Sequence, residues 1–359
     1  MARPCGSCLP SLPGFLFVIF CCSGFSATLE QIGPNLTLVE PFGIAFDSAG
    51  NSYICEYKGQ RITKLGKDGI ASRFAGTGTP GYGGDGGPAQ SATLHDPHGL
   101  LIGPNDQMYI ADTLNNRVRQ VDLKSGIIST LAGTGEKGFS GDGGPATQAA
   151  FDGVFGIALT KAGDKLFIAD LGNRRVRMID LKSGIISTVA GNGKDGIPAE
   201  GAIANQSSLQ DPRAVAINSR GTLYILERRG NALRAVDSEG KMRTLITPAS
   251  KPASKPASTH ASVSPDLNGP KHLCIDRDDN IVIADSENHQ IRKYSLRDGS
   301  LVTVVGAGQA GNRLSPRNPL DTQLNRPHGV IVNQSGDLFI VDSYNNRILK
   351  LVHYNRKNK

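Results

Sequence analysis

Six acidic side chains recur at nearly equal spacing along the chain, each at the end of a short apolar run. They are Glu56, Asp112, Asp170, Glu227, Asp285 and Asp342, and successive members lie 56 to 58 residues apart. Carboxylates gathered from six repeats could bind a metal ion or act as general acids and bases. A residue present in every repeat is better explained by something that every repeat needs. We therefore favour a structural role for this set.

Arginines stand at a nearly fixed distance after these acids, across a turn that contains Asn or Gly. Four of them come five residues after the acid, at Arg61, Arg117, Arg175 and Arg347, and two come seven residues after it, at Arg234 and Arg292. An ionised acid, an Asn amide and a guanidinium can form charge-assisted hydrogen bonds across a short turn. We predict that they act as turn clamps between the second and third strands of each repeat.

At a second repeat position the residue type changes from copy to copy. Such a departure from the repeat pattern is expected at a functional site. Each copy opens with Pro, or Val154 in the third, and the next residue is in turn Phe42, His98, Phe155, Arg213, Lys271 and His328. If this residue begins the innermost strand, the six would ring one mouth of a central opening. The positive charges of Arg213 and Lys271 at this opening suit a small anion or an acidic side chain of a partner. Solvated polar residues without a ligand fit the pattern equally well.

The repeats that must position these residues begin near 41, 97, 154, 212, 270 and 327. In the third copy, four strands are expected at 156–159, 165–169, 175–179 and 184–191. Short runs that are apolar on both faces and bounded by Gly, Asn, Asp or Pro indicate strands covered on two sides. Six such units predict an all-β fold, a six-bladed β-propeller of four-stranded antiparallel blades.

The two ends of the chain predict how the ring closes. The sixth copy runs out after its third strand, at 349–352, whereas residues 28–32 precede the first copy and have no place in it. We expect this N-terminal segment to supply the outermost strand of the last blade. Its deletion should expose a sheet edge and favour aggregation.

Residues 1–27 differ from the rest of the chain. Arg3 precedes an apolar stretch at 9–25, and the small residues Gly24, Ser26 and Ala27 follow, which is the pattern of a secretory signal peptide. An uncleaved membrane anchor is the alternative, although the apolar run is shorter than the roughly 20 residues that span a bilayer. We expect a secreted, extracellular or periplasmic propeller at 28–359, with no other membrane-spanning run.

Composition narrows the remaining function classes. Four of the six cysteines fall in the leader, and Cys55 and Cys274 lie in strand-like apolar runs, which predicts buried thiols rather than a disulfide or a nucleophile. The net charge of +7 permits nucleic-acid binding, but Trp is absent and no basic cluster is interleaved with aromatics. We therefore expect a monomer that does not bind nucleic acid.

Two kinds of connection interrupt the repeats. The glycine-rich stretches 81–89 and 138–146 are near copies of each other and predict compact fixed loops rather than a phosphate cradle, because no Lys-Ser/Thr pair follows them. Residues 248–265 repeat Pro-Ala-Ser-Lys and are expected to form a disordered low-complexity insertion.

The motifs Pro-x-Gly-Ile-Ala, Leu-Phe-Ile-Ala-Asp and Asn-x-Arg-Val-Arg resemble the NHL repeat, over about residues 28–352. The glycine-rich loops are similar to those of bacterial secreted NHL-repeat proteins. This resemblance implies the propeller fold. It leaves function open, because the scaffold carries ligand binding, protein scaffolding, RNA binding and enzyme activities.

Two enzyme classes with related propellers define the catalytic alternative. The NHL-like propeller of peptidylglycine amidating lyases holds a metal with histidines of Pro-His motifs from alternate blades. His98 and His328 match two of these motifs, and Arg213 stands in place of the third histidine. Zinc catalysis normally uses three protein ligands. Calcium-dependent gluconolactonase-like propellers need several acid and amide oxygens, and the ring of six has none.

We therefore predict a binding or scaffolding module without catalytic residues, metal or cofactor, whose channel mouth takes a protein, a glycan or a small anion. The alternative is a metal-assisted lyase or hydrolase of the amidating-lyase or gluconolactonase-like type, using zinc or calcium.

Overall fold

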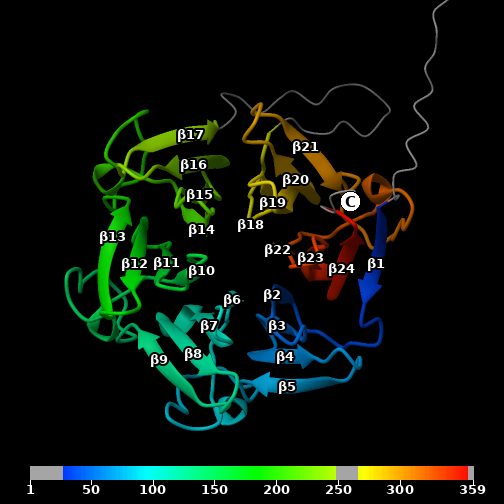
Figure 1. Ribbon diagram of the computed structural model, residues 1–359, viewed down its shortest axis with the longest axis horizontal. Helices are drawn as coiled ribbons and strands as arrows, with labels where there is room; N and C mark the ends of the chain where they lie inside the picture. Colours follow the sequence, from blue (N-terminus) through cyan, green and yellow to red (C-terminus); the bar gives the residue numbers. More distant parts are fainter. Residues whose placement is uncertain (1–26, 248–265, 355–359) are drawn as a thin grey trace, which may run out of the picture.

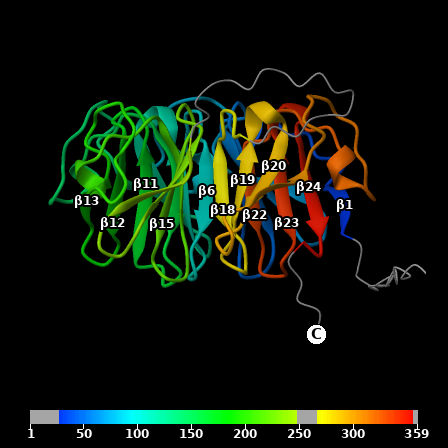
Figure 2. The same ribbon diagram turned by 90° about the horizontal axis from the view of Figure 1, so that it is seen from above.

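The computed structural model describes residues 27–247 and 266–354, and these form six four-stranded antiparallel sheets. The sheets stand like blades around a central axis (Figure 1), and the molecule is a flat disc when seen from the side (Figure 2). The predicted all-β six-bladed propeller is confirmed. The expected leader, apart from Ala27, and the insertion at 248–265 lie outside the described residues.

Each of the first three blades uses four consecutive strands. Blade 1 contains β2 (Pro41–Phe46), β3 (Ser52–Glu56), β4 (Arg61–Leu65) and β5 (Ala71–Ala75). Blade 2 contains β6 (Gly99–Ile102), β7 (Gln107–Asp112), β8 (Arg117–Asp122) and β9 (Ile128–Ala132). Blade 3 contains β10 (Val154–Leu159), β11 (Lys165–Asp170), β12 (Arg175–Asp180) and β13 (Ile185–Ala190).

The next two blades follow the same order. Blade 4 contains β14 (Pro212–Ile217), β15 (Leu223–Glu227), β16 (Ala232–Val236) and β17 (Met242–Ile246). Blade 5 contains β18 (His272–Ile275), β19 (Ile281–Asp285), β20 (Gln290–Tyr294) and β21 (Leu301–Val305). The helices of the described residues are 3-10 turns of three residues each: η1 (Ala89–Ser91), η2 (Thr113–Asn115), η3 (Ala146–Gln148), η4 (Ala204–Gln206), η5 (Ser286–Asn288), η6 (Pro319–Asp321) and η7 (Ser343–Asn345). None of them could cross a bilayer.

Blade 6 joins the two ends of the chain. It contains β22 (Gly329–Val332), β23 (Leu338–Asp342), β24 (Arg347–Val352) and, at its outer edge, β1 (Thr28–Ile32). Strand β1 pairs antiparallel with β24 from Thr28 opposite Val352 to Ile32 opposite Ile348. The two strands lie side by side at the rim in Figure 1. The predicted closure of the ring by the N-terminal strand is confirmed.

Apolar side chains fill the spaces between neighbouring blades. The cluster between blades 1 and 2, for example, brings Tyr53 and Cys55 of one sheet against Met108 and Ile110 of the next, all fully or almost fully buried. Side chains on both faces of each sheet are covered in this way, which explains why the strands read as continuous apolar runs. Cys55 and Cys274 are free thiols, and Cys55 is completely buried.

Each repeat acid ends the second strand of its blade and is completely buried at the turn that follows. In blades 1 and 6 it pairs with the Arg five residues later, and in blades 4 and 5 with the Arg seven residues later. The pairs are Glu56–Arg61 at 2.8 Å, Asp342–Arg347 at 2.7 Å, Glu227–Arg234 at 2.8 Å and Asp285–Arg292 at 3.4 Å. The acid also accepts backbone N–H groups, so each turn is held by charge-assisted hydrogen bonds.

Blades 2 and 3 differ from the predicted clamp. In blade 2 the partner of Asp112 is Arg119, at 3.3 Å, and not Arg117. Arg117 instead stacks on Tyr82, a residue of the first glycine-rich loop, with 3.6 Å between its guanidinium carbon and the ring centroid. Arg119 reaches the same loop through Asp85, at 2.5 Å. Blade 3 repeats this arrangement with Asp170, Arg175, Arg177, Phe139 and Asp142. The predicted pairing of Arg117 and Arg175 with the acid was wrong, because the aromatic residue of each loop stacks on the nearer Arg. Both arginines still hold the turn, through the carbonyl oxygens of Asn115 at 3.0 Å and Asn173 at 2.9 Å.

Candidate functional site

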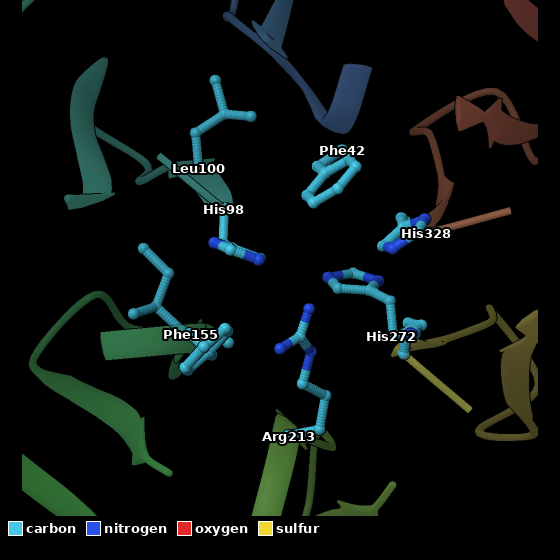
Figure 3. Close-up of a pocket in the computed structure, with 11 residues that line it drawn as sticks. Phe42, His98, Leu100, Phe155, Arg213, His272 and His328 are labelled. Atoms are coloured by element: carbon cyan, nitrogen blue, oxygen red, sulfur yellow. The ribbon is translucent and has the colours of Figure 1, made fainter. Parts of the chain in front are cut away.

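The variable side chains of the six blades converge at one mouth of the central channel. Phe42, His98, Phe155, Arg213, Lys271 and His328 all line one pocket there. Figure 3 shows the side chains of His98, Arg213 and His272 reaching toward the centre from three different blades. The enclosed part of the pocket has a volume of about 20 Å³, room for about one water, and the pocket is partly open to solvent.

Irregular backbone places these side chains in the channel. The register between the first two strands shifts by one residue where Phe42, Phe155 and Arg213 occur. Such a bulge leaves its residue out of the strand ladder and redirects its side chain. In the other three blades the equivalent residue stands immediately before the first strand, and its backbone N–H still bonds the second strand, as His98 does to the carbonyl of Ala111.

An aromatic stack forms one side of the mouth. The ring of Phe42 lies between Tyr57 and His328, with centroid distances of 4.4 Å and 3.9 Å and nearly parallel planes. His98 packs edge-on against Phe42 at 5.1 Å and against Phe155 at 4.5 Å. These contacts fix the positions of both histidines without using their ring nitrogens.

Arg213 is the cation at the centre of the site, and only 7% of the residue is exposed. Its guanidinium carbon lies 4.1 Å from the centroid of Phe155. Within residues 27–247 and 266–354 this guanidinium forms no hydrogen bond or ion pair. Burial, and next the nearby charge of Arg228, lower the pKa of Arg213 to about 9. A buried cation without a counter-ion is costly, so this group is suited to receive an anion.

Acidic groups around the mouth are already engaged by other cations. Asp211, the residue before Pro212, accepts from Arg228 Nε at 2.7 Å, and its charge only partly offsets the effect of burial on the pKa of Arg213. In the neighbouring blade 5, Glu287 bonds Arg326 and lies 3.4 Å from Lys271 Nζ. Lys271 keeps a pKa lowered to about 8, chiefly by burial and then by Arg213. The rim therefore presents paired charges, whereas the centre is cationic.

Hydrogen bonds of the ring nitrogens define the protonation of His98 and His328. His328 Nδ1 lies 2.8 Å from the carbonyl oxygen of Arg326, which can only accept, so Nδ1 carries the proton. His98 Nδ1 lies 3.2 Å from the carbonyl oxygen of Asp96 and 3.1 Å from Thr113 Oγ1, whose own proton goes to the carbonyl oxygen of Val154 at 2.5 Å. Burial, with the charge of Arg213, holds the pKa of both histidines well below the usual value. Both rings are therefore neutral, with a lone pair on Nε2.

His272 also lines the pocket, and sequence reasoning missed it. Its Nδ1 accepts the backbone N–H of Val330 at 3.4 Å, so its neutral ring has the proton on Nε2. Burial lowers the pKa of His272 to about 4. A signal was present in the sequence: the other repeats have Gly or Ala at this position, for example Gly99 and Ala214. A histidine has a larger side chain than Gly or Ala and needs space for its ring, which here lies in the channel.

The residues of the mouth do not fit a zinc or calcium site. In the part of the chain that the structure describes, no three His, Cys, Asp or Glu side chains lie close enough together to hold a metal ion. Three neutral histidines, His98, His272 and His328, line the pocket beside Arg213 and Lys271, which repel a metal cation. Zinc needs three protein ligands close together, which these histidines do not provide, and calcium would lack its oxygens.

Fold and site together define a six-bladed β-propeller with a cationic channel mouth. The Teneurin NHL domain model matches residues 187–354. The chain is 24% identical over 351 residues to NHL repeat-containing protein 2 of Bos taurus, which covers 90% of this chain and 48% of the relative. It is 26% identical over 278 residues to the chloroplastic protein SUPPRESSOR OF QUENCHING 1 of Arabidopsis thaliana, which covers 75% of this chain and 26% of the relative. The family model and these relatives support an NHL-repeat β-propeller family for the chain.

The chain spans at most about half the length of these curated relatives. Among solved structures, a Bacteroides thetaiotaomicron protein of unknown function superposes with a TM-score of 0.64 at 14% identity, covering 90% of this chain and 75% of the other. A gluconolactonase from Xanthomonas campestris superposes with 0.59 at 13%, covering 90% and 89%. A streptogramin B lyase gives 0.53 at 13%, covering 90% and 97%. At these identities the likeness shows the fold alone.

Proposed function

We propose that this propeller is a binding or scaffolding module without catalytic activity, which acts outside the cytoplasm and holds an anionic group of its ligand at the channel mouth. The ligand is a protein, a glycan or a small anion. The buried guanidinium of Arg213 carries this proposal, because it lines the pocket and forms no hydrogen bond or ion pair among the described residues. The leader-like residues 1–27 support action outside the cytoplasm.

The arrangement of charges supports an anion over a cation or a neutral ligand. Lys271 adds a second positive charge to the pocket, and the acids of the rim are bound to Arg228 and Arg326. An anion that enters would be largely desolvated, and charge pairs are stronger there than in water. The small enclosed volume of the pocket suits a small group, such as the tip of a side chain, rather than a large rigid ligand.

A metal-assisted lyase or hydrolase is the second candidate, and one observation favours it. His98 and His328 each donate Nδ1–H to a backbone carbonyl, as histidines that bind metals do. Metal analysis of the purified protein separates the two proposals. Zinc or calcium at one equivalent, lost in a His98→Ala variant, would reject the binding module in favour of the enzyme.

Calorimetric titration with small anions tests the binding proposal directly. We expect phosphate and glycolate to bind the native protein. Arg213→Gln should lower the affinity for the more tightly bound of these two anions at least about tenfold, because it removes the central charge. The matched control is Arg243→Gln, which removes an equal charge from an exposed outer strand. Equal affinity of the native protein and the Arg213 variant would reject the proposal.

A further inference from the structure

The ring nitrogens of the mouth divide into hydrogen-bond donors and acceptors. His98 and His328 use Nδ1–H on backbone carbonyls, which leaves a lone pair on Nε2. His272 uses Nδ1 as an acceptor, which leaves Nε2–H as a donor. Within the described residues none of the three Nε2 atoms forms a hydrogen bond, and none belongs to the buried polar atoms without a partner. The pocket therefore offers Arg213 and His272 as donors, and His98 and His328 as acceptors.

We propose that the channel mouth selects an oxyanion that itself carries a hydrogen-bond donor, such as an α-hydroxy carboxylate or a monoprotonated phosphate. This inference rests on the proposed function and names the chemistry of its ligand. The negative oxygens meet Arg213 and the Nε2–H of His272, and the hydroxyl proton goes to the Nε2 of His98 or His328.

An anion that only accepts hydrogen bonds fits this set poorly. Its oxygens would face the lone pairs of His98 and His328, and those two acceptors would lose water without gaining a donor. A binding site can distinguish two similar ligands because the wrong one leaves a buried polar group of the site unpaired, which lowers its affinity. The ligand's hydroxyl thus supplies the specificity, while Arg213 supplies the attraction.

The backbone keeps this pattern fixed. A histidine can become a donor at both nitrogens only by taking up a proton, and the groups that face these rings oppose it. Arg213 of blade 4 and Lys271 of blade 5 both disfavour a charged His98 or His328, and Arg326 adds to the effect on His328. No carboxylate of the described residues lines this pocket. The acceptors therefore stay acceptors at neutral pH.

Matched pairs of anions test the inference on the native protein. Glycolate is acetate with one added hydroxyl, and hydrogen phosphate has the shape and charge of sulfate but carries one proton. In calorimetric titrations at pH 7, we expect glycolate to bind at least about tenfold more tightly than acetate, and phosphate more tightly than sulfate. For glycolate and acetate we expect no net proton uptake, so that their heats agree in buffers of different ionisation enthalpy. Equal affinities within both pairs, or uptake of a proton with either acetate or sulfate, would overturn the inference.

Variants assign the selectivity to the two acceptors. The double variant His98→Gln, His328→Gln can present amide donors in the same places, so the preference for glycolate over acetate should fall to within about twofold. His95→Gln is the control, because His95 lies outside the pocket and donates its backbone N–H to Asp112. A double variant that keeps the full preference contradicts the assignment.

The two proposals fail in different ways. If neither member of either pair binds, or if Arg213→Gln binds all four anions as well as the native protein does, the anion site itself is wrong. If all four bind through Arg213 with equal strength, the anion site holds and only the selectivity is wrong.

Discussion

At the scale of single residues, Arg213 and Arg234 show two uses of a buried guanidinium in the same blade. Arg234 pairs with the completely buried Glu227 at 2.8 Å, and the pair holds a turn. Arg213 is also buried, yet within the described structure it stacks on the face of Phe155 and forms no ion pair. An arginine kept at such a position lowers stability, and binding is the function that would account for it.

Replacing each arginine by Met should therefore change stability in opposite directions. Arg213→Met removes an unpaired charge at similar volume and should raise the free energy of unfolding by about 1–3 kcal/mol, whereas Arg234→Met strands Glu227 and should lower it by about 3–5 kcal/mol. Urea unfolding in an anion-poor buffer measures both. A destabilised Arg213 variant would mean that its charge is already compensated in the free protein.

Anion affinity should fall as the solution becomes alkaline. The pKa of Lys271 is lowered to about 8 and that of Arg213 to about 9, so both are charged below these values and lose their charge as pH rises through them. Affinity for glycolate should be constant near pH 6.5 to 7 and drop at least about tenfold by pH 9.5. Lys271→Met should remove the earlier part of the decline. A profile that is flat up to pH 9.5 would contradict the assignment.

Sequence spacing identified the mouth residues but not all of the pairing around them. The variable position after the opening Pro lies in the channel in every blade, because the repeat places matched positions in a circle. Arg117 and Arg119 lie on the same face of β8, so spacing alone cannot decide which of them reaches Asp112. Tyr82 and Asp85 decide it, and they come from a loop about 30 residues earlier in the chain. His272 was missed, although the other repeats have a small residue at the equivalent position.

At the scale of elements, the innermost strands set the width of the channel by their close approach. A Cβ added to Gly156 would come within 2.6 Å of Ala214 Cα and 3.0 Å of the carbonyl oxygen of Arg213. Gly99 is less confined, since a Cβ there would lie 3.3 Å from its nearest neighbour, the carbonyl oxygen of Phe155. The strands were predictable from their apolar runs, but the bulges that aim the site residues carry no such pattern.

Alanine substitutions at Gly156 and Gly99 should differ in their effect on stability, because the strand contact at Gly156 is closer than the one at Gly99. Gly156→Ala must move the strand that carries Arg213, so we expect it to lower the free energy of unfolding by about 1–3 kcal/mol and to weaken glycolate binding. Gly99→Ala should change stability by less than about 1 kcal/mol. Thermal unfolding and titration of both variants provide the check. Equal effects would show that the strand contact at Gly156 relaxes freely.

At the scale of the whole molecule, the ring depends on β1, the one strand of blade 6 that comes from the other end of the chain. Leu29 of β1 is completely buried, whereas Glu30 is half exposed and makes an ion pair of 3.5 Å with Lys350. The sequence predicted this closure because the last repeat lacks a fourth strand. It could not predict the channel width, which depends on how all six blades pack.

Leu29→Ala should lower the free energy of unfolding by about 2–5 kcal/mol and promote aggregation by freeing the edge of β24. Glu30→Ala, its neighbour on the solvent side, should change it by no more than about 1 kcal/mol. Urea unfolding and light scattering measure the two effects. Similar stability of the two variants would mean that β1 does not hold the ring together.

Anion binding at Arg213 is the central claim, and a crystal structure of the native protein grown with saturating glycolate tests it most directly. We predict electron density for the carboxylate within hydrogen-bond distance of the Arg213 guanidinium, with the hydroxyl directed at His98 or His328. A channel that holds only water under these conditions, or an Arg213 that turns to a carboxylate of the protein itself, would contradict the claim.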